Sequence, residues 1–277
     1  DAALTPALYS VHEEWAREAH RLGWSTVKVA EEAIIDLGDL AFKGKKFQDV
    51  RTAFNHAKRE GIRAEWASYP SLPPHLKQQV DAICQAWADE KALPEMGFTL
   101  GGLREINDSD TRLLLALDEE GRIHAVTSWM PVHSGGEVIG LTLDVMRRDD
   151  SGFRLAIDFL VGQAALLAQD EGLQFISLSG APLAESGQCE ESAELADSRF
   201  AFAPVLDVMG SVMEPVYGFR SLLAYKKKFQ VRFVPLYLAI PDIANAPAVG
   251  LAIAHAYLPN MSAVSAVGVA AKLVSRD

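Results

Sequence analysis

Residues 137–180 constrain the fold most, because they show the patterns of a strand, a helix and a second strand in succession. GEVIGLTLDVMRR is a strand pattern, and SGFRLAIDFLVGQAALLAQDEG (151–172) is a helix pattern. The helix is expected to be capped by Ser151 or Asp150 and to end at Gly172. QFISLSG (174–180) is again apolar. Such a unit normally joins two parallel strands by a crossover, so we predict an α/β protein.

The rest of the chain extends this pattern on both sides. Before Pro94 the patterns alternate between helices and one strand, and after it they are mainly strands. We predict two α/β units, residues 1–92 and 93–242, followed by an apolar tail at 243–277. The expected helices are 11–22 (ended by Gly23), 47–60 (ended by Gly61), 74–90 and 217–229; the expected strands are 25–37, 97–103, a hairpin with its turn at 118–121, and 231–240, which closes the sheet; 185–200 is expected to be a loop.

Composition narrows the range of partners. The chain has 277 residues and a net charge of −11, so nucleic acid or anionic lipid must be met by a local basic patch. Cys84 and Cys189 are far apart, and there is no CxxC, HExxH or Walker-type motif. We therefore expect no metal and no cofactor, and a reducing compartment.

Residues 243–271 contain no Asp, Glu, Lys or Arg, and an apolar run of this length suggests a membrane span. Pro247, Pro259 and Asn260 interrupt the run. We therefore expect two short apolar segments packed on the protein body, and the alternative is a tail that touches a membrane. Because the chain opens on Asp1, we also expect it to be part of a longer protein.

A carboxylate interrupts the apolar strand near its end. Strand alternation predicts that Ile139, Leu141, Leu143 and Val145 share one face and that Asp144 lies on the other. Arg147 follows at the end of the strand, and Ser179-Gly180 ends the next strand beside it. Ligands of open α/β sheets bind at the carboxyl ends of strands. A structural ion pair and a catalytic pocket are both compatible with this pattern.

Two basic clusters also have two interpretations each. The first cluster lies at the end of a helix and consists of Lys226, Lys227 and Lys228. These lysines either interact favourably with the helix dipole or contribute to a catalytic site. Lys45, Lys46 and Arg51 mark either a solvated helix face or a phosphate-binding patch.

Five segments in this order resemble the catalytic domain of aminoacyl-phosphatidylglycerol synthases, the multiple peptide resistance factor family. The segments are FKGKKFQDVR, EMGFTLGGL, DVMRR, ISLSGAPLA and YGFRSLLAYKKKF with PLYLAIP after it. The resemblance covers about residues 5–242. It implies a fold of tandem acetyltransferase-like (GNAT) α/β units with mixed central sheets flanked by helices. It also implies that the longer protein carries more of the first unit and an N-terminal transmembrane region.

The resemblance implies transfer of a lysyl or alanyl group from aminoacyl-tRNA to a hydroxyl of phosphatidylglycerol at the cytoplasmic face of the membrane. The product lipid is less anionic, and the family is linked to antimicrobial peptide resistance. By resemblance, Asp144 and Arg147 match the family's Asp-x-x-Arg, either Lys226 or Lys228 its essential lysine, and Glu214, less closely, its acidic residue. We expect substrate contacts from Ser179, Gly180 and Tyr217, and tRNA contacts from Lys45, Lys46 and Arg51.

We expect Asp144 to bind the substrate's α-amino group or, more in keeping with an acid of ordinary pKa, to orient Arg147. Arg147 and a lysine would hold the lipid phosphate or stabilise the oxyanion, and the lysine could protonate the departing ribose oxygen. Three alternatives stay open. They are an acyl-CoA-dependent acetyltransferase, whose pyrophosphate-binding turn has no complete copy here, a peptidoglycan-bridge aminoacyltransferase, and a non-catalytic tRNA- or membrane-binding module.

Overall fold

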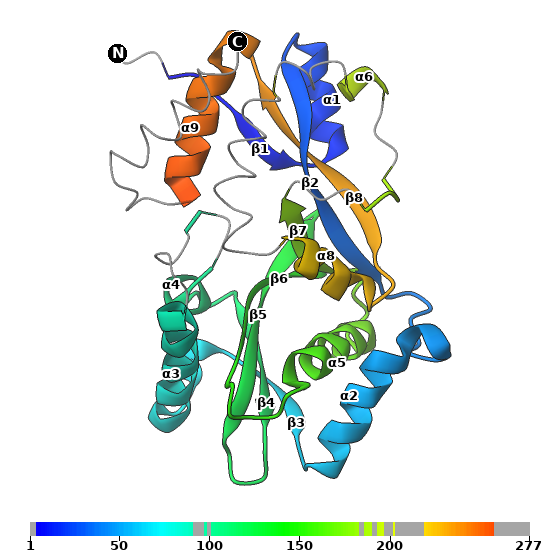
Figure 1. The fold of residues 1–277 in the computed structure, drawn as a ribbon, viewed down its shortest axis with the longest axis vertical. Coiled ribbons are helices and arrows are strands. Elements are labelled where there is room, and N and C mark those ends of the chain that lie inside the picture. Colours follow the sequence, from blue (N-terminus) through cyan, green and yellow to red (C-terminus); the bar gives the residue numbers. More distant parts are fainter. Residues whose placement is uncertain are drawn as a thin grey trace.

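A single eight-stranded mixed sheet runs through the protein (Figure 1). The computed structural model describes residues 4–90, 97–98, 101–182, 186–189, 193–196, 202 and 219–257. The strand order is β1-β8-β2-β7-β6-β5-β4-β3. β6 (Glu137–Arg148) and β7 (Phe175–Pro182) pair in parallel through α5 (Ala156–Asp170), which confirms the predicted crossover. The other neighbouring pairs are antiparallel.

The remaining elements agree in most places with the sequence patterns. The strands are β1 (Leu8–Val11), β2 (Ser25–Asp36), β3 (Arg63–Ala67), β4 (Arg112–Leu117), β5 (Ile123–Ser134) and β8 (Arg232–Ile240). The helices are α1 (Glu13–Arg21), α2 (Gln48–Arg59), α3 (Pro74–Glu90), α4 (Leu103–Ile106), α6 (Ala193–Ala196), α8 (Phe219–Lys227) and α9 (Ala246–Tyr257), with short 3₁₀ turns at Lys45–Phe47, Tyr69–Ser71 and Ile243–Asn245.

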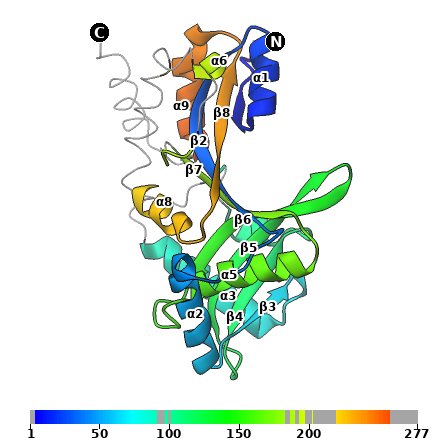
Figure 2. The same ribbon diagram turned by 90° about the vertical axis from the view of Figure 1, so that its right-hand side faces the viewer.

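Helices cover both faces of the sheet, so its central strands are apolar on both sides. Along β4, Leu114 and Ala116 join the core under α2 and α5, whereas Leu113 and Leu115 join the core under α3. Figure 1 shows α2 and α5 on one side of this part and α3 and α4 on the other. Figure 2 shows β2 and β8 continuing together into the other end, where α1, α6 and α9 surround them. The predicted α/β class with a mixed sheet flanked by helices is confirmed, and the arrangement is consistent with the tandem acetyltransferase-like description.

Strand order mixes the two predicted units. β2, from the first 92 residues, lies between β7 and β8, and β3 forms the opposite edge. Because one sheet contains strands from both predicted units, the strand order does not mark a boundary at residue 92, and the division there stays a prediction. The expectation that 231–240 closes the sheet is wrong, because the short β1 pairs outside β8.

Two local predictions are also wrong. The described residues of the expected 97–103 strand, 97–98 and 101–103, do not form a strand. A helical turn, α4, begins at Leu103 instead. The Glu105 carboxylate caps this turn by accepting the Gly102 N–H at 2.8 Å. The crossover helix begins at Ala156 instead of near Ser151. There the Asp149 carboxylate accepts the Ser151 N–H at 2.9 Å and forms a turn before the helix.

The apolar stretch after β8 forms one short helix within the described residues. The inward side of α9 is buried, and the Tyr257 hydroxyl lies 3.1 Å from that of Tyr9. The second apolar segment expected before residue 271 lies outside the described residues. In the described part of the chain, no helix combines the length and the apolar composition that a membrane span requires.

Candidate active site

A β-bulge near the end of β6 decides where its polar side chains point. Thr127 pairs with Met146 and Trp129 with Leu143, so residues 144 and 145 both lie opposite Ser128. The Ser128 hydroxyl oxygen accepts the Val145 N–H at 2.8 Å and fixes the extra residue. A bulge of this kind inserts one residue into the alternation of the strand.

The bulge corrects the predicted face of β6. Leu143 and Met146 pack in the core under α5, but Val145 packs in the core under α3. Val145 therefore does not share a face with Leu143. Residues three apart on a regular strand point to opposite faces. Because of the extra residue, Asp144 and Arg147 are instead brought to the same face, the one covered by α3.

Asp144 is held against a glycine backbone. Its Oδ1 accepts the Gly101 N–H at 2.9 Å, and a Cβ at Gly101 would fall 1.6 Å from Oδ2. Oδ2 is buried and receives no hydrogen bond from any described residue. Burial raises the pKa of Asp144, with the charge of Glu105 adding to the effect, while the Gly101 N–H and Arg147 oppose it. The Oδ2 atom of Asp144 is thus a buried carboxyl oxygen that can still accept a hydrogen bond.

Arg147 lies beside α3. Its guanidinium carbon is 3.3 Å from the centre of the Trp87 ring, and it donates to the Met146 carbonyl at 2.9 Å. Both side chains line a cavity of about 700 Å³ between α3 and the loop that follows β6. Stacking on Trp87 holds the plane of the guanidinium group at the edge of this cavity.

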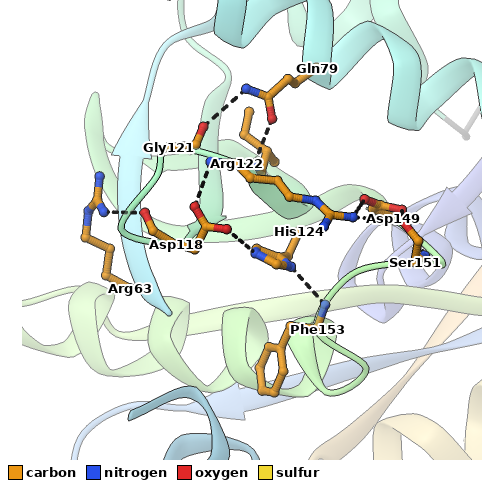
Figure 3. Close-up of polar contacts among 10 residues, drawn as sticks. Arg63, Gln79, Asp118, Gly121, Arg122, His124, Asp149, Ser151 and Phe153 are labelled. Atoms are coloured by element: carbon orange, nitrogen blue, oxygen red, sulfur yellow. Dashed lines mark hydrogen bonds and ion pairs between the residues drawn. The ribbon is translucent and has the colours of Figure 1, made fainter. Parts of the chain in front are cut away.

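Several other residues that line this cavity belong to the polar network in Figure 3, which links α3 to the loop after β6. Arg122 donates to Asp149 at 2.5 Å and to Ser151 at 2.7 Å. His124 accepts the Phe153 N–H on Nδ1 at 2.9 Å, so its ring hydrogen lies on Nε2, 3.0 Å from Asp118. Both ring nitrogens have partners, and His124 therefore acts as a brace rather than a free base.

The three lysines of α8 and the turn after it have different surroundings. Lys226 is 3% exposed, and its Nζ donates to the carbonyls of Ser179 and Gly180, each at 2.9 Å. Lys228 instead pairs with Asp158 at 3.1 Å, and Lys227 is exposed. Burial lowers the pKa of Lys226 to about 7, although the charge of Glu32 opposes the change. Of the three, Lys226 has the position and the environment of a proton-transfer group.

Ser179 links the lysine to the bulge on β6. β6 and β7 pair only from Gly140–Phe175 to Thr142–Ser177, after which β7 pairs with β2 alone. At this divergence Ser179 has a φ of 65°, and its hydroxyl donates to the carbonyl of Leu143, the residue before Asp144. Asp144 and Lys226 therefore flank the carboxyl end of the parallel pair, where ligand binding was predicted.

Comparison with known proteins identifies the family of this chain. The family described as "Phosphatidylglycerol lysyltransferase, C-terminal" matches residues 1–240. The chain belongs to this family. A protein of Corynebacterium glutamicum described as uncharacterized is 44% identical over 91% of the chain and 31% of its own length. The lysylphosphatidylglycerol biosynthesis bifunctional protein LysX of Nocardia farcinica is 26% identical over 93% of the chain and 22% of its own length. The chain thus spans less than a third of these relatives.

Two solved structures share the fold of this chain. L-PGS from Bacillus licheniformis superposes with a TM-score of 0.72 at 23% identity, covering 91% of this chain and 72% of that one. The C-terminal domain of a putative lysylphosphatidylglycerol synthetase from Agrobacterium fabrum gives a TM-score of 0.70 at 22% identity, with the same coverages. These structures support the fold, and the family match over residues 1–240 confirms the family expected from the sequence.

The residues expected to contact tRNA do not line the cavity beside Arg147 and Trp87. Lys45 and Lys46 form the exposed 3₁₀ turn before α2, and Arg51 donates to the Gly44 carbonyl on the same turn. Lys46 also lines a second cavity of about 590 Å³, together with Gln230 from the turn after α8. The basic patch therefore adjoins the end of the helix that carries Lys226, and its role stays a prediction.

Two of the expected site residues lie outside the described part of the chain, and three residues near the site were not among those expected. Glu214 and Tyr217 fall outside the described residues. Sequence reasoning did not single out Trp87, Gly101 or Glu32. For Glu32 a signal was present, because two adjacent acids, Glu31 and Glu32, interrupt the apolar residues in the middle of the 25–37 strand.

Proposed function

We propose that this domain transfers a lysyl or alanyl group from aminoacyl-tRNA to a hydroxyl of phosphatidylglycerol or a related lipid. Family membership supports the lipid acceptor, and the names of the LysX relatives favour lysyl over alanyl. The observation that carries the proposal is Lys226, a buried amine with a pKa of about 7 beside the diverging strands.

The geometry of Lys226 suits proton transfer in both directions. A neutral amine has two hydrogens, and the carbonyls of Ser179 and Gly180 accept two hydrogen bonds from Nζ. The lone pair is then left to accept the proton of the lipid hydroxyl. An ammonium in the same place has a third hydrogen to donate to the ribose oxygen. With a pKa of about 7, both forms are populated near neutral pH.

The reaction is an ester exchange. The lipid oxygen attacks the ester carbonyl carbon, a new carbon–oxygen bond forms, and the bond to the ribose oxygen breaks. Lys226 takes the proton from the lipid hydroxyl and returns it to the ribose oxygen, so no redox partner is needed. We assign the buried Oδ2 of Asp144 to the donor's α-ammonium and the stacked Arg147 to the lipid phosphate or the oxyanion. This differs from the orienting role preferred for Asp144 on sequence grounds, because its hydrogen-bond donor is Gly101.

The proposal extends to partners and location. Lys45, Lys46 and Arg51 contact tRNA phosphates, which gives a net-acidic protein a local basic surface. The domain works at the cytoplasmic face of the membrane, next to the lipid surface, and an N-terminal transmembrane region belongs to the full-length protein.

A transfer assay tests the proposal. The domain is incubated with phosphatidylglycerol micelles and tRNA charged with labelled lysine or alanine, and the extracted lipid is counted with and without RNase. RNase-sensitive label in the lipid identifies the donor and supports the proposal. Acetyl-CoA turnover, without label from either tRNA, would overturn it in favour of an acetyltransferase.

A further inference from the structure

The backbone segment whose carbonyls accept hydrogen bonds from Lys226 is strained at Ser179 and needs support. Ser179 has a φ of 65°, a left-handed conformation that non-glycine residues rarely adopt because their Cβ crowds the backbone. It lies in an irregular part of the β2–β7 ladder, where Glu32 pairs with Gly180 and Ile34 with Ser177. At this irregularity the carbonyls of Ser179 and Gly180 accept the two hydrogen bonds from Lys226.

A chain of hydrogen bonds from β2 supplies the support. The Ser177 hydroxyl donates to Glu32 Oε1 at 2.5 Å, so its oxygen is left to accept the Ser179 N–H at 3.0 Å. The other carboxylate oxygen of Glu32 lies 2.6 Å from Nε2 of His12. The Glu32 side chain is 14% exposed, whereas that of His12 is 53% exposed. These hydrogen bonds therefore run from the exposed His12, through the partly buried Glu32 carboxylate and Ser177, to Ser179, whose carbonyl accepts a hydrogen bond from Lys226.

The pKa shifts of Glu32 and His12 are consistent with an ionised Glu32. Burial alone would raise the pKa of Glu32, but its hydrogen bonds with His12 and Ser177 hold the pKa below its usual range. The hydrogen bond to Glu32 raises the pKa of His12 in turn. The negative charge of Glu32 also raises the pKa of Lys226 and so opposes the effect of burial.

We propose that Glu32 is a positioning residue for Lys226: through Ser177 it fixes the Ser179–Gly180 carbonyls, and through its charge it holds the ammonium. The first part of the polypeptide thereby supplies a charge to a site whose proposed catalytic charges, Asp144, Arg147 and Lys226, all follow residue 143. This inference rests on the proposed function, in which Lys226 transfers the proton.

The test measures Lys226 directly as well as turnover. In protein labelled with ¹³C at lysine Cε, the Lys226 signal is identified by its absence in Lys226→Met and is titrated in the wild type, Glu32→Gln and Glu32→Asp. Glu65→Gln on β3 is the control, because it removes one exposed carboxylate from the far edge of the sheet.

In Glu32→Gln the Lys226 midpoint is expected to fall by roughly one pH unit, as for the loss of a nearby opposite charge. The midpoint of the pH–rate profile moves with it, kcat falls roughly tenfold, and KM changes little. Glu32→Asp keeps the charge and restores the Lys226 midpoint toward the wild type. Glu65→Gln changes neither quantity.

Ser177→Ala keeps the Glu32 charge and removes its link to Ser179, which covers the case in which Glu32→Gln fails to fold. A lower kcat with the Lys226 midpoint still near 7 is expected. An unmoved Lys226 midpoint in Glu32→Gln, or wild-type kcat in Ser177→Ala, would overturn the inference. A shifted midpoint together with wild-type protein that transfers nothing would support the Glu32–Lys226 link and overturn the proposed function instead.

Discussion

Replacing Lys226 with methionine is expected to change how the stability of the domain depends on pH. In the folded protein burial lowers the pKa of this amine from 10.5 to about 7. The unfolded chain therefore binds more protons than the folded one between these two pH values. Stability contributed by this group rises with pH across that window and is lost as pH falls through it.

The size of the effect follows from linkage. The free energy of unfolding changes by at most about 1.4 kcal/mol per pH unit for one group. Integrated between pH 7 and pH 9 for pKa values of 7 and 10.5, the wild type gains about 2 kcal/mol from Lys226. Methionine has a similar length and no charge, so this gain is absent in the variant. The carbonyls that lose their donor shift the variant's stability by a constant, which does not alter the difference in slope.

Urea unfolding at pH 7, 8 and 9, followed by circular dichroism, measures this difference. The free energies of unfolding of wild type and Lys226→Met are expected to diverge by about 2 kcal/mol in favour of the wild type as pH rises. Lys227→Met, which removes an exposed lysine, serves as the control and should run parallel to the wild type. Parallel curves for Lys226→Met as well would refute the lowered pKa and remove the basis for Lys226 as a proton-transfer group.

Three further changes test the β6 side of the site. Gly101→Ala places a Cβ 1.6 Å from Asp144 Oδ2 and is expected to lower transfer at least roughly tenfold, whereas Gly38→Ala, with nothing within 4 Å, should not; equal activities would contradict the contact. Ser128→Ala leaves the buried Val145 N–H without its acceptor, so chemical denaturation should show a loss of about 1–3 kcal/mol, and an unchanged midpoint would argue against the bulge. Arg147→Lys loses the planar stack on Trp87, and kcat/KM should fall roughly tenfold; wild-type kinetics would show that only the charge matters.

Much of the fold could be predicted because the relevant signals are local. The parallel crossover through 137–180 and the β4–β5 hairpin follow from hydrophobic periodicity and from turn residues close to each element. The order of the strands does not follow in this way. β1 pairs outside β8, and β2 lies between β8 and β7. These pairings join residues more than a hundred positions apart, and periodicity within a segment carries no information about them.

The candidate site was predicted in part for the same reason. Asp144 and the lysine cluster stand out as charges beside apolar runs, and the family resemblance named them. Which lysine faces β7 depends on the rotation of α8 over the sheet, and the structure gives Lys226 that position. Glu32 was missed because its link to the site runs through Ser177, 145 positions away.

Sequence alone determined the fold class, the family and the residues that carry charge near the strand ends, because these depend on the order of side chains along the chain. Only the tertiary structure decided how those charges act. Regular alternation would place Asp144 and Arg147 on opposite faces, and the bulge opposite Ser128 brings them to one face. Burial, which the whole fold creates, then gives Lys226 a pKa that its sequence neighbours could not have indicated.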